Sequence, residues 1–132
     1  MVEPYLSTAL VVDDNFYNRD LCTLALSHVG YNVMEACDGM EALNLLQSRA
    51  FDLLVLDLSM PVVSGIEVIQ HLDADPAYRH LTIIVLTANP HMITADVQAR
   101  ADFVMNKPID IQHFAQLVER LSKNAAARNN AG

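Results

Sequence analysis

Basic residues are scarce in this sequence, in which 8 Lys and Arg stand against 16 Asp and Glu and leave a formal net charge of -8. Binding to the phosphates of nucleic acids requires clustered Lys and Arg. The charge balance therefore argues against nucleic-acid binding by this chain.

Long apolar runs and signal-peptide features are also missing. No apolar run approaches the roughly 20 residues that a membrane span needs, and the start of the chain, "MVEPYLS", lacks the basic start and apolar body of a signal peptide. We therefore expect a cytoplasmic protein that makes no membrane contact.

Cysteine occurs only at Cys22 and Cys37. Their spacing fits no metal-ligand motif, and in a reducing compartment we expect two buried thiols rather than a disulfide. Neither residue is assigned a function.

The chain does have enough apolar sequence for one core. Hydrophobic residues make up 52% of its 132 residues, which excludes disorder as the default, and the length suits one domain. We expect that domain to span 1–124. The end of the chain, "NAAARNNAG", has no apolar stripe beyond Ala, so a disordered tail is expected over 125–132.

Two kinds of segment alternate along the domain, which is the pattern of strand-helix units. Continuous apolar runs at 8–12, 52–56 and 81–87 predict parallel strands that are covered on both faces. The segment 31–36 alternates between apolar and polar residues and suits a strand nearer an edge, and 102–105 is the fifth and weakest strand.

Helical patterns fill the intervals between these strands. The first pattern has a predicted apolar side of Phe16, Leu21, Leu24 and Val29, and it stops at Gly30, which suits the left-handed position after a helix. Two other patterns open with capping-box spacing. The predicted helices cover 15–30, 38–48, 64–72, 91–100 and 109–121.

Five strands and five helices in strict alternation predict an α/β fold, a five-stranded parallel sheet that is doubly wound as (βα)5. Ligands of such sheets bind outside the carboxyl ends of the strands. The chemically active residues at those ends are Asp13, Asp14, Asp57, Thr87 and Lys107.

Asp57 poses a physical problem, because it ends an apolar run that is expected to be buried. Burying a charge costs several kcal/mol unless a partner compensates it. The repulsion between three neighbouring carboxylates is relieved by protonation or by a hard cation such as Mg²⁺. This cation prefers carboxylate oxygens, water and phosphate as ligands. A carboxylate so neutralised can attack phosphorus and give an aspartyl phosphate, whose oxygens Lys107 and Thr87 can contact.

Each of these residues also has an ordinary explanation. Asp13 and Asp14 suit a turn or a helix cap, Asp57 a solvated strand end, Thr87 a strand, and Lys107 a surface. Their joint placement at four strand ends favours a site over these separate explanations.

The same segments carry a resemblance to a known family. In order and spacing, the chain over about 6–122 resembles the receiver domains of two-component response regulators, typified by the single-domain chemotaxis type. The matching segments are "LVVDDN", "GYNVMEACDGMEALNLL", "FDLLVLDLSMPVVSG", "IIVLTA" and "NKPID". The resemblance implies the flavodoxin-like strand order 2-1-3-4-5 and a phosphorylation-controlled switch, not an enzyme with an outside substrate.

The resemblance also implies a role for each acidic residue. Asp57 would accept the phosphoryl group. Asp14 and Asp57 would bind Mg²⁺ directly, Asp13 would act through a water, and the backbone carbonyl of Ser59 would complete the protein ligands.

The remaining implied roles concern the switch and the loops. Thr87 is expected to be the hydroxyl that moves toward the phosphoryl group, and Lys107 the cation that pairs with it. A cis peptide bond is expected between Lys107 and Pro108, and Gly65 matches the family's glycine after the Met60-Pro61 loop.

The chain departs from the family on one face. The usual Tyr or Phe three residues before the lysine is replaced by Val104, and Phe103, one place earlier, should point to the opposite face because side chains alternate along a strand. Arg100 replaces a common glycine, and the segment from Thr87 to Lys107 is about two residues short, so the helix at 91–100 is expected to be short or mobile.

Two other functions fit part of the pattern. A phosphohydrolase of the haloacid dehalogenase type also uses an Asp nucleophile with Mg²⁺, but it needs a second Asp two places later, where this chain has Ser59. The other interpretation is a pseudo-receiver, which binds a protein without being phosphorylated. The intact acidic cluster argues against this interpretation, whereas Val104 in the aromatic position keeps it open.

The implied partners are proteins. The resemblance points to a sensor histidine kinase or a histidine phosphotransfer protein as phosphodonor, and to a downstream protein that the sequence does not specify. We expect a monomer, since the departures fall on the face through which this family can dimerise. The sequence fits a stand-alone receiver as well as one cut from a larger regulator or hybrid kinase.

Overall fold

The computed structural model describes residues 7–60 and 63–131, with side chains as far as residue 124. Five parallel strands form one sheet in the order β2-β1-β3-β4-β5, which confirms the expected fold class and strand order. The strands are β1 (Thr8–Val12), β2 (Asn32–Ala36), β3 (Leu53–Asp57), β4 (Thr82–Thr87) and β5 (Phe103–Asn106).

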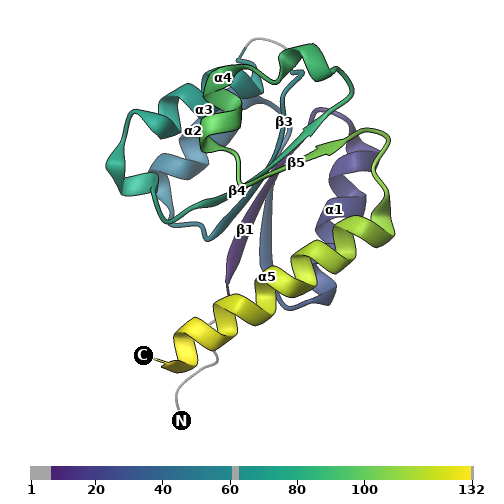
Figure 1. The fold of residues 1–132 in the computed structure, drawn as a ribbon, viewed down its shortest axis with the longest axis vertical. Coiled ribbons are helices and arrows are strands. Elements are labelled where there is room, and N and C mark those ends of the chain that lie inside the picture. The colour runs from purple at the N-terminus through teal and green to yellow at the C-terminus, as the bar shows by residue number, and fades with distance from the viewer. Residues whose placement is uncertain (1–6, 61–62, 132) are drawn as a thin grey trace.

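Helices cover both faces of the sheet (Figure 1). One face carries α1 (Phe16–His28) and α5 (Ile111–Ala131), which contact each other. The other face carries α2 (Gly39–Ser48), α3 (Gly65–Asp73) and α4 (Ala95–Arg100). Two short 3-10 helices, η1 (Pro76–Tyr78) and η2 (Pro90–Met92), precede β4 and α4.

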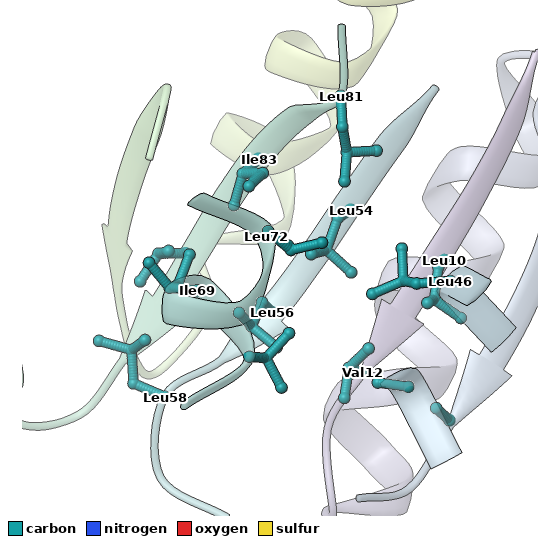
Figure 2. Close-up of a cluster of buried hydrophobic side chains, with 14 of the residues drawn as sticks. Leu10, Val12, Leu46, Leu54, Leu56, Leu58, Ile69, Leu72, Leu81 and Ile83 are labelled. Carbon is teal, nitrogen blue, oxygen red and sulfur yellow. The ribbon is translucent and has the colours of Figure 1, made fainter. Parts of the chain in front are cut away.

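The sheet has two cores, because side chains of a strand alternate between its faces. Leu10, Leu54 and Ile83 are fully buried on the face of α2 and α3, where Leu72 of α3 packs among them (Figure 2). Phe114 of α5 is fully buried in the core on the opposite face. Each such side chain contributes about 1.5–3 kcal/mol to stability by leaving water.

The register of the sheet aligns the strand ends. Asp57 of β3 pairs with Leu86 of β4, and Thr87 of β4 pairs with Asn106 of β5. Because all neighbouring strands are parallel, the carboxyl ends of β1, β3, β4 and β5 lie at one edge of the sheet. This is the edge at which the sequence predicted the site.

The buried side of α1 differs from the predicted one. Phe16 and Leu24 are 59% and 61% exposed, whereas Cys22 and Leu26 are buried against the sheet and α5. Cys22 and Leu26 lie four residues apart, so they share a helix face. The prediction was wrong for Phe16, Leu21 and Leu24 because apolar residues occur on more than one side of this helix, and the pattern alone does not say which side meets the sheet.

The ends of three helices follow from local chemistry. Gly30 has φ +101°, the left-handed conformation that was expected after α1. The Asp38 carboxylate accepts from the backbone N–H of Glu41 at 2.8 Å, and the Ser64 hydroxyl accepts from the backbone N–H of Glu67 at 3.3 Å. Both N-caps therefore lie where the capping-box spacing placed them.

The fourth helix is short, as expected. The 3-10 helix η2 takes up Pro90–Met92, and α4 begins only after Thr94, whose hydroxyl accepts from the backbone N–H of Val97 at 3.4 Å. Only six residues of the predicted 91–100 form the α-helix itself.

The last helix is longer than expected. It continues to Ala131, so the backbone over 125–131 is helical where the sequence predicted a disordered tail. This stretch contains three consecutive alanines, and alanine has the highest helix propensity of all residue types. The helix can therefore continue without an apolar stripe. The end of the domain at residue 124 stays a prediction.

The two cysteines are free thiols in different settings. Cys22 is buried, as expected, whereas Cys37 is exposed, contrary to the expectation. In the described part of the chain, no helix is both long enough and apolar enough to cross a membrane.

Candidate functional site

Three acidic residues converge at the carboxyl edge of the sheet. Asp13 and Asp14 follow β1, and Asp57 is the last residue of β3. One carboxylate oxygen of each lies within 4.8 Å of the others. Asp13 and Asp57 are buried, at 1% and 2% exposure, and Asp14 is exposed. The convergence predicted from the strand ends is therefore present.

Lys107 joins this cluster from the loop after β5. Its Nζ lies 2.9 Å from Oδ2 of Asp13 and 3.3 Å from Oδ2 of Asp57. Burial opposes the charge of the ammonium, but pairing with Asp13 and then with Asp57 raises the pKa of Lys107 above its ordinary value. The lysine stays protonated and supplies one positive charge to a group of three carboxylates.

The buried setting of Asp57 disfavours its charged form. Burial is the main cause that raises its pKa from 3.8 to about 6, and the charge of Asp13 adds to the effect. The backbone N–H of Ser59 donates to Oδ1 of Asp57 at 3.1 Å and, with Lys107, opposes the rise. Lys107 and the Ser59 N–H therefore do not fully offset the cost of burying the charge of Asp57.

Gly65 allows the start of α3 to lie in close contact with the backbone of Asp57 and Leu58. A Cβ at this position would meet the carbonyl oxygen of Asp57 and would lie 2.6 Å from the Cα of Leu58. The N–H of Gly65 donates to the carbonyl of Leu58 at 3.1 Å. The first turn of α3 therefore lies directly against the backbone that carries the Asp57 side chain.

The Thr87 hydroxyl lies at the end of β4 and is completely buried. It donates to the carbonyl of Asn89 at 2.9 Å and accepts from the backbone N–H of Asn89 at 3.0 Å. The N–H of Lys107 donates to the carbonyl of Thr87 at 2.9 Å, which ties the threonine to the lysine loop. The peptide bond between Lys107 and Pro108 is cis, as expected.

On the face beside Thr87, Val104 occupies the position at which the resemblance leads one to expect an aromatic ring. Val104 is 41% exposed, while Phe103 packs into the core shared with α5. This confirms that the two side chains point to opposite faces. Arg100, the other departure, donates to the carbonyls of Tyr78 and Leu81 at 2.6 and 2.8 Å and so ties the end of α4 to the loop before β4.

Two residues at the site were not singled out from the sequence. Asn89 holds the Thr87 hydroxyl, and Arg19 of α1 donates from Nη1 to the carbonyl of Asp13 at 2.8 Å. Asn89 follows a strand end by two residues, where side-chain to backbone turns are common. Arg19 lies six places after Asp13, and no sequence pattern marks its contact.

The comparisons with known proteins agree with this geometry. The family model of the response regulator receiver domain matches residues 9–119. The polar-differentiation response regulator DivK of Brucella anthropi is 29% identical over 116 residues, which cover 85% of this chain and 93% of the relative.

Solved structures give the same result. The chemotaxis response regulator CheY4 of Vibrio cholerae has a TM-score of 0.79 and 28% identity, covering 89% of this chain and 99% of that one. The response regulator TrrA of Thermotoga maritima, solved in complex with Mg(2+)-BeF, has a TM-score of 0.76 and 32% identity, covering 88% of this chain and 99% of its own. The chain therefore belongs to the response regulator receiver domains, the phosphorylation-controlled signalling switches of two-component systems.

Proposed function

We propose that this chain is switched by transfer of a phosphoryl group to Asp57 in a reaction that requires Mg²⁺. One observation carries the proposal: a buried carboxylate ends a central strand, 3.3 Å from a lysine ammonium and grouped with two further carboxylates. An oxygen of Asp57 would form a bond to phosphorus as the bond to the donor breaks, and the departing group would keep the electron pair.

The acidic cluster fits Mg²⁺. Its donors are carboxylate oxygens from Asp13, Asp14 and Asp57, gathered within 4.8 Å, and hard divalent cations prefer such oxygens. The carbonyl of Ser59 is proposed as a further ligand. When bound, the cation would offset carboxylate repulsion and polarise the oxygens of the phosphoryl group.

Lys107 and Thr87 would respond to the new charge. Lys107 already pairs with Asp57, so it can pair with a phosphoryl oxygen without crossing the site. The Thr87 hydroxyl would have to leave the carbonyl of Asn89 in order to donate to the phosphoryl group. With Val104 in the aromatic position, we propose that no ring follows this movement.

The phosphodonor is proposed to be a sensor histidine kinase or a histidine phosphotransfer protein. Helix α1 begins next to the acidic turn and exposes Phe16, Tyr17, Leu21 and Leu24, at 59%, 76%, 40% and 61%. Exposed large apolar side chains grouped on one helix are typical of a docking surface. A partner with an apolar helix face would bind there and present its phosphohistidine to Asp57.

The test is the intact mass after incubation with acetyl phosphate or phosphoramidate, with and without Mg²⁺. We expect one phosphoryl adduct on the wild-type chain in the presence of Mg²⁺, and none on Asp57→Asn. Labelling that survives Asp57→Asn would place the acceptor elsewhere. Failure to label a wild-type chain that binds Mg²⁺ would favour a pseudo-receiver that acts by protein contact alone.

A further inference from the structure

Arg19, in the second turn of α1, reaches back to the acidic turn. Its Nη1 donates to the backbone carbonyl of Asp13 at 2.8 Å, and its Nε donates to a carboxylate oxygen of Glu35, on the edge strand β2, at 2.9 Å. The guanidinium carbon also lies 5.6 Å from the centre of the Phe16 ring. The arginine side chain is only 17% exposed.

The carbonyl that accepts from Arg19 belongs to the peptide that joins Asp13 to Asp14. The N–H of Asp13 donates to the carbonyl of Ala36 at 3.2 Å, and Oδ1 of Asp13 accepts from the N–H of Asn15 at 2.9 Å. Arg19 therefore supplies a charged side-chain donor to this peptide, whereas the other two bonds hold the neighbouring N–H and the carboxylate of Asp13. Hydrogen bonds from charged donors are about twice as strong as neutral ones.

Glu35 directs the charge of Arg19 away from the carboxylates. An arginine beside three aspartates could pair with their side chains and compete with a cation for their oxygens. Here the guanidinium is occupied by Glu35 and by a backbone oxygen. The planar guanidinium suits this double use, because its donors point in fixed directions.

We infer that Arg19 is a positioning residue, which holds the peptide between Asp13 and Asp14 so that both carboxylates face a divalent cation. The inference rests on the proposed function, because it concerns the same acidic site. Residues that orient metal ligands in other proteins change metal affinity by 10- to 100-fold when they are replaced.

The sign of the effect separates positioning from simple electrostatics. Removing a positive charge near three carboxylates should, by Coulomb attraction alone, make Mg²⁺ bind more tightly. Releasing the peptide between Asp13 and Asp14 should make Mg²⁺ bind more weakly. Arg19→Gln removes the charge and the guanidinium together, so the direction of the change identifies the role.

The experiment is a calorimetric titration of the full chain with Mg²⁺ at a temperature far below unfolding. For Arg19→Gln we expect the Kd for Mg²⁺ to rise about 10-fold. Arg19→Lys keeps the charge and one contact, so its Kd should lie between those of the wild type and Arg19→Gln. If Arg19→Gln does not fold, the lysine variant carries the test by itself, with a rise of at least about threefold.

Arg100→Gln is the matched control. Arg100 is 14% exposed and also donates to backbone carbonyls, those of Tyr78 and Leu81, but at the opposite end of β4. Its loss should lower the stability of the fold and leave the Kd for Mg²⁺ unchanged. An equal rise in Kd for Arg100→Gln would show that the effect of Arg19 is general destabilisation and would overturn the inference.

The remaining outcomes distinguish this inference from the proposed function. Wild-type binding of Mg²⁺ combined with an equal or lower Kd for Arg19→Gln would overturn the role of Arg19 alone. A wild-type chain that fails to bind Mg²⁺ at millimolar concentrations would overturn the Mg²⁺ site of the proposed function and the role of Arg19 with it.

Discussion

Replacement of Asp57 by Asn should stabilise the metal-free protein, although it removes the proposed acceptor. The two side chains have nearly the same shape, so the main change is the loss of one buried negative charge. Burial raises the pKa of Asp57 from 3.8 to about 6, which means that the fold disfavours its charged form. Each pKa unit corresponds to 1.36 kcal/mol, so the shift sets an upper limit of about 3 kcal/mol. We expect a gain of about 1–3 kcal/mol at pH 7.

The pH dependence has a definite sign. Since the folded-state pKa of Asp57 lies above the unfolded value, the penalty is present in full above about pH 6 and disappears as the pH falls through 6 toward 3.8. The advantage of Asp57→Asn should therefore shrink between pH 7 and pH 4. If Mg²⁺ binds the acidic cluster as proposed, added Mg²⁺ should stabilise the wild type more than the variant, because a ligand of the folded state shifts the equilibrium toward it.

The assay is urea unfolding followed by far-UV circular dichroism, with a chelator present. Asp73→Asn, at an exposed position near the end of α3, removes the same formal charge away from the site and should change stability by less than about 0.5 kcal/mol. The reasoning would be refuted if, without metal at pH 7, Asp57→Asn were no more stable than Asp73→Asn.

Three further predictions test the packing and the switch. Leu26→Ala should lower the free energy of unfolding by about 2–5 kcal/mol, because Leu26 is fully buried. Leu24→Ala, at a 61% exposed position on the same helix, should lower it by less than about 1 kcal/mol. Equal losses for the two variants would contradict the assignment of the buried face of α1. Gly65→Ala should cost about 1–3 kcal/mol, because its Cβ would lie 2.6 Å from the Cα of Leu58, and an unchanged urea midpoint would show that the chain can open there at little cost. Val104→Tyr should leave the phosphoryl adduct at the wild-type level by intact mass, because this 41% exposed side chain lies outside the acidic cluster, and loss of the adduct would assign the position a part in the chemistry.

Most of the fold could be predicted from local pattern. The segments that form β1, β3 and β4 are continuously apolar, as a strand that is covered on both faces requires. Their bounds agree with the prediction to within one residue. Helix faces were less predictable. On α1, apolar residues lie on several sides, and the choice of Cys22 and Leu26 as the buried pair depends on where the sheet and α5 lie.

The acidic cluster was predictable for a topological reason. Once the strands are known to be parallel, Asp13, Asp57 and Lys107 must emerge at one edge whatever the details of packing. The contacts of Arg19 were not predictable in this way. They join a helix to the turn before it and to the edge strand β2, and they depend on how α1 lies against the sheet.

Strand periodicity, capping residues and the order of strand ends are properties of short segments, so the amino-acid sequence was sufficient for the parallel sheet and for the acidic residues at its edge. The exposed apolar side of α1, the tie from Arg19 to Asp13 and the hydrogen bonds that hold Thr87 to Asn89 became visible in the folded chain. Each depends on the angle and distance at which two elements meet, and packing of the whole core sets those quantities.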